Sequence, residues 1–195
     1  MEEVFESISP SQAAKTVLND TIPCLINDIE IDRSIRFTTG IEEFDRVLGG
    51  GLVQGSIVLL AGDPGIGKST ILLQTGKAIC KDGRTALYVS AEESASQVKL
   101  RAQRLGVQSN SLYIYSQTNF EAIKRQIDEI KPQILIIDSI QAVYTDSVTS
   151  SPGSVSQIRE CTNILMDIAK NKNITVVVIG HVTCLLYTSD AADEL

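Results

Sequence analysis

The residues best suited to chemistry lie in one short stretch, residues 62–70. It reads Gly-Asp-Pro-Gly-Ile-Gly-Lys-Ser-Thr and fits the pattern G-x-x-x-x-G-K-[ST], a glycine-rich turn that wraps a polyphosphate. Glycines let the backbone approach phosphate closely, and the N–H groups at the start of the next helix attract negative charge. The stretch predicts a nucleotide-binding loop made of Gly62, Asp63, Pro64, Gly65, Ile66, Gly67, Lys68, Ser69 and Thr70.

The side chains at the end of this loop have distinct expected roles. Lys68 would reach the β- and γ-phosphates of a nucleotide, and the Ser69 hydroxyl would bind Mg²⁺. Thr70 is expected at the helix start or on the α-phosphate rather than on the metal. The alternative is a glycine-rich turn that binds nothing, but the apolar run 57–61 before the loop and the helical pattern after it favour the nucleotide site.

Apolar segments of two periodicities alternate along the rest of the chain. We expect helices at 41–48, 68–81, 94–105, 119–130 and 154–170, and strands at 57–61, 85–89, 112–115, 134–138 and 174–179. Short β-branched strands without polar alternation, separated by helices, are typical of a parallel sheet covered on both faces. The pattern predicts an α/β fold with a mostly parallel sheet.

Polar residues follow several of these strands. Ligands of open parallel sheets bind beyond the carboxyl ends of the strands, so these residues are candidates for the site. Asp138 closes the most apolar strand and is predicted to hold Mg²⁺ through water, the alternative being a helix or turn cap. Ser139 follows it directly.

Two further candidates follow neighbouring strands. Glu92 is predicted to orient the attacking water, with Glu93 as second choice, although either could instead stabilise the first turn of a helix. His181 could hydrogen-bond the γ-phosphate and signal its loss to the loop that follows. It could equally be an ordinary core or loop residue. Lys68, Glu92 and His181 are thus the expected catalytic group.

Composition limits the remaining possibilities. The 195 residues are 43% hydrophobic, which is enough for one well-buried domain. A net charge of −7 argues against a nucleic-acid surface built on bulk positive charge, and the basic residues at 99–104 and 124–125 are interpreted as solvated helix faces.

Four scattered cysteines and one histidine do not indicate a disulfide framework or a zinc site. We expect a cytoplasmic protein, because neither a long apolar run nor a signal-peptide pattern is present.

Several segments together carry a family resemblance. Residues 39–52, the loop, Tyr-Val-Ser-Ala-Glu-Glu-Ser at 88–94 and Pro-Gly-Ser-Val-Ser-Gln at 152–157 resemble the RecA-like ATPase core of the RadA (Sms) family of bacterial DNA repair proteins. The resemblance covers residues 30–183. Some of these segments are shared with the wider RecA and KaiC group, whereas 152–157 and Asp-Ser-Ile-Gln at 138–141 look specific to the RadA family.

The resemblance implies a RecA-like P-loop NTPase that hydrolyses ATP and binds single-stranded or branched DNA. It implies a role in processing recombination intermediates, as a homo-oligomeric ring with recombinase or helicase partners. The loop 145–156 would face DNA, where serines, a glycine and backbone N–H groups can contact phosphates without positive charge. A plain surface connection is the alternative for this loop. A KaiC-like nucleotide-dependent assembly switch that binds no DNA is the alternative function.

The resemblance also suggests how the chain is divided. Residues 1–35 are expected to be a linker or lead-in arm, 36–183 a truncated ATPase core, and 184–195 a non-native or poorly ordered tail. Proteins of the family begin with a four-cysteine zinc module, and after the core they carry a Lys-Asn-Arg-Phe-Gly segment and a Lon-protease-like domain. This sequence contains none of these, so slow turnover is expected.

Overall fold

The computed structural model describes residues 25–28, 36–81 and 83–181. The chain divides into two units, residues 1–34 and 35–195. In the first unit the described residues include a short 3-10 helix, η3 (Ile26–Asp28). Residues 1–24 and 29–35 of the expected lead-in arm and the expected tail 184–195 lie outside the described residues, so those expectations remain predictions.

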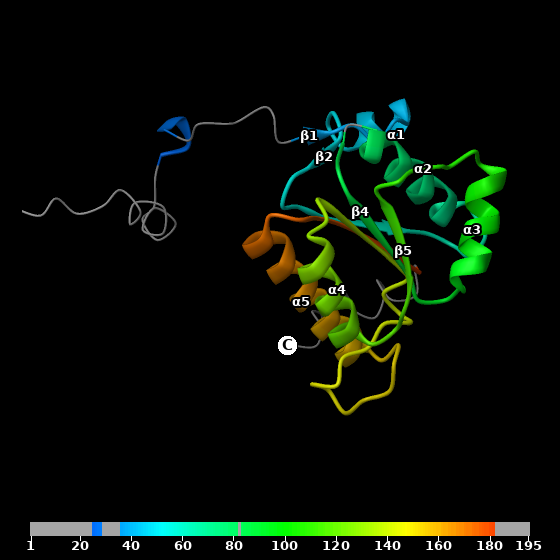
Figure 1. Ribbon diagram of the computed structural model, residues 1–195. Coiled ribbons are helices and arrows are strands. Elements are labelled where there is room, and N and C mark those ends of the chain that lie inside the picture. The colour runs from blue at the N-terminus through cyan, green and yellow to red at the C-terminus, as the bar shows by residue number, and fades with distance from the viewer. Residues whose placement is uncertain (1–24, 29–35, 82, 182–195) are drawn as a thin grey trace, which may run out of the picture. The chain divides into compact units, whose positions relative to one another are not determined.

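The second unit is built on a five-stranded sheet (Figure 1). In spatial order the strands are β3 (Ile57–Ala61), β7 (Thr175–Gly180), β6 (Ile134–Asp138), β4 (Ala86–Ser90) and β5 (Leu112–Ser116). Every neighbouring pair is parallel. The structure therefore confirms the predicted parallel sheet, with β3 and β5 at its two edges.

Helices cover both faces of this sheet (Figure 1). The helices α2 (Lys68–Lys81) and α3 (Ala95–Arg104) pack on one face, and α4 (Phe120–Ile130) and α5 (Val155–Lys172) pack on the other. The residues of β4 alternate between the two cores: Tyr88 faces α2, whereas Leu87 and Val89 face α4 and α5. Because both faces are covered, the central strands are apolar along nearly their whole length, which is the pattern that predicted them.

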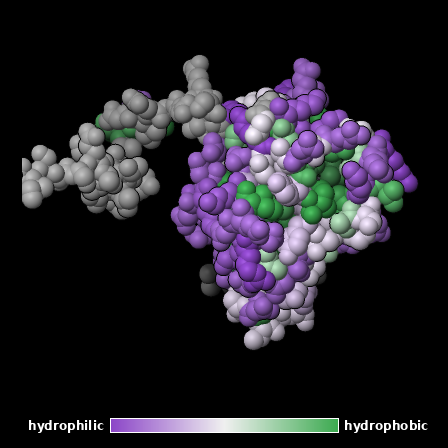
Figure 2. Space-filling model, viewed as in Figure 1, coloured by the Kyte–Doolittle hydropathy of each residue, from purple (hydrophilic) through white to green (hydrophobic). Residues whose placement is uncertain are grey.

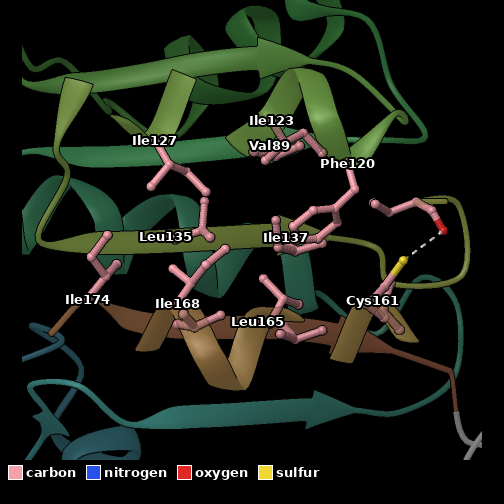
Figure 3. Close-up of a cluster of buried hydrophobic side chains, with 14 of the residues drawn as sticks. Val89, Phe120, Ile123, Ile127, Leu135, Ile137, Cys161, Leu165, Ile168 and Ile174 are labelled. Atoms are coloured by element: carbon pink, nitrogen blue, oxygen red, sulfur yellow. Dashed lines mark hydrogen bonds between the residues drawn. The ribbon is translucent and has the colours of Figure 1, made fainter. Parts of the chain in front are cut away.

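Figure 3 shows the core between the sheet and the helices α4 and α5. Side chains from β6, such as Leu135 and Ile137, point toward Leu165 of α5 and Phe120 of α4. Cys161 lies in this core and donates to the Val143 carbonyl. Burial raises the pKa of its thiol to about 11, so the thiol stays protonated and Cys161 serves as a packing residue.

Local sequence signals set the helix ends. Ser94 and Gln97 form a capping box at the start of α3, and the Asn119 side chain accepts from the Ala122 N–H at 3.1 Å at the start of α4. The helix α4 stops where Lys131 adopts a left-handed conformation before Pro132. Caps of this kind are readable from sequence, which is why the predicted helices match the observed ones closely.

A small element before β3 was not predicted. The two-residue strands β1 (Arg36–Phe37) and β2 (Leu52–Val53) pair antiparallel on either side of the short helix α1 (Glu42–Val47). Phe37 and Leu52 are both buried in the core beside α2, and the Arg84 guanidinium lies 4.7 Å from the centre of the Phe37 ring. The segment before β3 is thus attached to the domain by hydrophobic burial and a cation–π contact.

The surface seen in Figure 2 is largely hydrophilic, with hydrophobic residues gathered near the middle of that face. Among the described helices, none is long and apolar enough to cross a membrane.

Candidate functional site

Four neighbouring strands end at one cavity of about 300 Å³. The register places Ala61 of β3 beside Gly180 of β7, and Ser90 of β4 beside Asp138 of β6, so the segments after these strands meet at one edge of the sheet. The cavity is lined by Pro64, Gly65, Gly67, Lys68, Ser69, Thr70, Glu92, Glu93, Arg101, Asp138, Ser139, Ile179 and His181. The fold thus brings together residues that stand more than a hundred positions apart.

The loop between β3 and α2 has the shape of an anion cradle. Gly65 and Gly67 have φ angles of +81° and +98°, which residues with a side chain rarely adopt. A Cβ added at either glycine would meet no atom within 4 Å. The loop leads into the first turn of α2, where N–H groups lack helical partners and the helix dipole favours negative charge. These residues fit a polyphosphate.

Lys68 is fixed inside this loop. Its side chain is buried, and its Nζ donates to the carbonyl oxygens of Gly62 and Asp63, both at 2.7 Å. Gly62 and Asp63 therefore hold the lysine across the loop rather than line the cavity. Ile66 also lies outside the cavity lining, with its side chain 62% exposed. The remaining residues of the predicted nucleotide loop all line the cavity.

Asp138 is held by a buried tyrosine that sequence reasoning did not select. The Tyr88 hydroxyl donates to Oδ2 of Asp138. Burial, followed by the negative charge of Asp138, raises the pKa of Tyr88 far above its usual range. The phenol consequently stays protonated and keeps its hydrogen bond to Asp138, one of the two residues predicted to bind a metal ion.

Glu92 is held in a similar way by a neighbouring strand. The Ser139 hydroxyl donates to Oε1 of Glu92, and Nε2 of His181 lies 3.8 Å from the same oxygen. About half of the Glu92 side chain remains exposed, on the cavity side. Nδ1 of His181 is buried, and among the described residues it has no hydrogen-bond partner. Glu92 and His181 are therefore neighbours within one site.

Glu93 takes a different position from Glu92. Its carboxylate forms an ion pair with Arg101 of α3, and its backbone oxygen accepts from the hydroxyls of Ser90 and Ser116 at 2.8 and 2.6 Å. Arg101 was interpreted from sequence as part of a solvated helix face, but its side chain lines the cavity. Its spacing of three residues from the apolar Val98, which is buried, is a sequence signal that could have indicated this.

The oxygen donors of the cavity suit a hard cation such as Mg²⁺. The Ser69 hydroxyl and the Asp138 carboxylate are both present on its wall. Within the described part of the chain, no group of three His, Cys, Asp or Glu side chains could hold a metal ion. A cation bound here would therefore take further ligands from phosphate and water, as Mg²⁺ commonly does.

The segment between β6 and α5 is organised by one buried glutamine, Gln157. Its Nε2 lies 2.9–3.1 Å from the carbonyl oxygens of Thr145, Val148 and Ser150, and its Oε1 accepts from the Thr145 N–H at 3.0 Å. Next to it, the hydroxyls of Ser150, Ser154 and Ser156 bond to one another. The loop 145–156 thus has an internal framework that presents hydroxyl groups.

The Tyr88–Asp138 contact predicts a pH effect. Free tyrosine has a pKa of 10.0, and the pKa of Tyr88 in the folded chain is higher. The unfolded chain therefore loses the Tyr88 proton at a lower pH than the folded chain does. The stability of the wild type relative to Tyr88→Phe should be constant below pH 10 and fall above it. Urea unfolding of both proteins from pH 7 to 11 measures this difference in stability. Spectrophotometric titration of the two folded proteins should give equal phenolate absorbance up to pH 11. An extra wild-type phenolate near pH 10 would contradict the assignment.

The comparisons with known proteins agree with this geometry. Residues 28–184 match the family described as AAA domain. The chain is 48% identical over 185 residues to the DNA repair protein RadA of Listeria monocytogenes, and 52% identical over 161 residues to that of Bacillus subtilis. It is also 52% identical over 165 residues to the DNA repair protein RadA of Chlamydia trachomatis.

These alignments cover 83–93% of this chain but only 35–40% of the relatives. The chain therefore spans well under half the length of the curated proteins it matches. The parallel sheet, the glycine-rich loop and these similarities agree with the RecA-like P-loop fold that the sequence predicted. The chain belongs to the AAA domain family and is a RadA-like segment within it.

Proposed function

We propose that this chain binds ATP with Mg²⁺ and hydrolyses it. The observation that carries the proposal is a single cavity that combines the glycine-rich loop, Lys68, Ser69, Asp138 and Glu92. Phosphoryl transfer needs positioning and charge stabilisation more than covalent chemistry, and this set supplies both. The family match supports the same conclusion.

Each residue has a role that its contacts support. The N–H groups of the loop and the Lys68 ammonium bind the β- and γ-phosphates, in place of part of the bonding between Lys68 and the loop carbonyls. When bound, Mg²⁺ neutralises charge on the phosphate oxygens. Ser69 and Asp138 face it, and Tyr88 holds one oxygen of Asp138.

Glu92 orients the attacking water and accepts its proton. The Ser139 hydroxyl fixes Oε1 of the carboxylate, which removes rotational freedom from the base before the reaction begins. His181 lies beside Glu92 and is the candidate sensor of the γ-phosphate. These assignments make the site a hydrolase site rather than a simple nucleotide pocket.

Loss of the loop lysine should abolish nucleotide binding. Lys68→Ala removes a buried cation and should weaken ATP affinity by about 100-fold or more, which corresponds to roughly 3 kcal/mol. Isothermal titration calorimetry with Mg-ATP measures the change. Lys81→Ala, at the exposed end of the same helix α2, is the matched control and should bind like the wild type. Unchanged affinity in Lys68→Ala would remove the basis of the nucleotide assignment.

Glu92 should affect turnover rather than binding. Glu92→Gln keeps the size and one acceptor but removes the base, so turnover should fall by about 10²–10⁴-fold while ATP affinity changes little. Steady-state phosphate release measures turnover, and Glu129→Gln on the exposed face of α4 is the control. Full turnover in Glu92→Gln would exclude Glu92 as the base.

We further propose that the loop 145–156 binds single-stranded or branched DNA. The relatives are named DNA repair proteins, and the loop presents serine hydroxyls from a fixed framework. Exposed Arg159 follows on the first turns of α5 and adds a cation next to the loop. The proposal includes a cytoplasmic homo-oligomeric ring that handles recombination intermediates together with recombinase or helicase partners.

Arg159 should contribute to DNA affinity. Arg159→Ala should weaken binding of a fluorescent single-stranded oligonucleotide several-fold, about the effect of one lost phosphate contact, and should reduce the salt dependence. Lys170→Ala, an exposed cation near the far end of the same helix, should leave both unchanged. Fluorescence anisotropy gives the affinities. Equal behaviour of the two variants, with ATP turnover indifferent to DNA, would favour the KaiC-like assembly switch.

A further inference from the structure

The cavity holds a second permanent cation besides Lys68. Among the described residues, the ionisable groups that line the cavity are the carboxylates of Glu92, Glu93 and Asp138, the cations Lys68 and Arg101, and His181. The Lys68 ammonium donates hydrogen bonds to two carbonyl oxygens of the glycine-rich loop. Arg101 is not part of the glycine-rich loop, and the proposed mechanism gives it no role.

The ion pair between Arg101 and Glu93 is open to the cavity. The two side chains are 31% and 32% exposed, and both line the cavity wall. A pair with this exposure contributes little to stability, because water screens its charges and two long side chains lose conformational freedom. The ion pair therefore contributes little to holding α3 in place, and either side chain can change its partner at a small cost in free energy.

Arg101 shares the cavity with the residues proposed to bind Mg-ATP. Its side chain lines the same wall as Lys68, Ser69 and Asp138. It comes from the β4–α3 side of the cavity, the side that also carries Glu92. A guanidinium presents a planar fork of N–H donors that matches two phosphate oxygens as well as it matches a carboxylate.

We infer that Arg101 is a phosphate contact supplied by the same chain, with Glu93 as its partner in the nucleotide-free site. This rests on the proposed ATP site. When Mg-ATP binds, the guanidinium exchanges the Glu93 carboxylate for oxygens of the terminal phosphate, on the side of the cavity where Glu92 lies. Glu93 therefore competes with the nucleotide for Arg101, and it does not act as a second base.

Competition gives the two partners opposite effects on affinity. Arg101→Gln should weaken Mg-ATP binding about tenfold, the value of one charge-assisted contact, and should weaken Mg-ADP binding less. Glu93→Gln releases Arg101 and should strengthen Mg-ATP binding by about two- to fivefold. Calorimetric titration of the 195-residue chain with each nucleotide gives these values. Arg104→Gln, an exposed arginine on the same helix α3, is the matched control and should bind like the wild type.

The same experiment separates this inference from its alternatives. If the pair only fastens α3, both variants should lose affinity and should melt at lower temperature without nucleotide, which would overturn the inference. Wild-type affinity in Arg101→Gln would also overturn it while leaving the ATP site intact. If the wild type bound no ATP, the proposed function would fail as well. Opposite shifts, with unchanged melting temperatures in the absence of nucleotide, would establish the role of Arg101.

Discussion

The parallel register of the sheet is the constraint on which the site depends. Backbone hydrogen bonds set Ala61 beside Gly180 and Ser90 beside Asp138, and this alignment fixes where four strands end. The loop after β3 and the segments after β4, β6 and β7 then share one edge and enclose the cavity. A shift of β6 by one residue would turn Asp138 to the face of the sheet opposite to Tyr88 of β4. The pairing of the strands therefore determines the geometry of the site.

Burial on both sides of the sheet decides where polar chemistry can lie. The central strands face two hydrophobic cores, so polar groups within them must find partners or be confined to the strand ends. Tyr88 is the exception inside β4: its ring packs in the core beside α2, and its hydroxyl reaches Asp138. The apolar core and the polar site meet at this residue, because a ring buried in the core carries the hydroxyl that bonds to Asp138.

The helix and strand pattern could be predicted because its signals are local. Capping residues such as Ser94 and Asn119, the left-handed stop at Lys131 and the apolar strand runs each act within a few residues. The strands β1 and β2 were missed because two residues carry no periodicity. They are defined instead by the burial of Phe37 and Leu52 against the rest of the domain, a contact between distant parts of the chain.

The sequence by itself determined the glycine-rich loop, the order of helices and strands, and the candidates Lys68, Ser69, Glu92 and Asp138, because spacing along the chain defines a loop and marks strand ends. Only the tertiary structure decided which partners these residues have. Tyr88 meets Asp138, Ser139 meets Glu92, and Arg101 turns into the cavity toward Glu93. The first two contacts join residues 50 and 47 positions apart, and the third depends on which side of α3 faces the sheet. Such contacts follow from strand register and helix packing, neither of which a local pattern specifies.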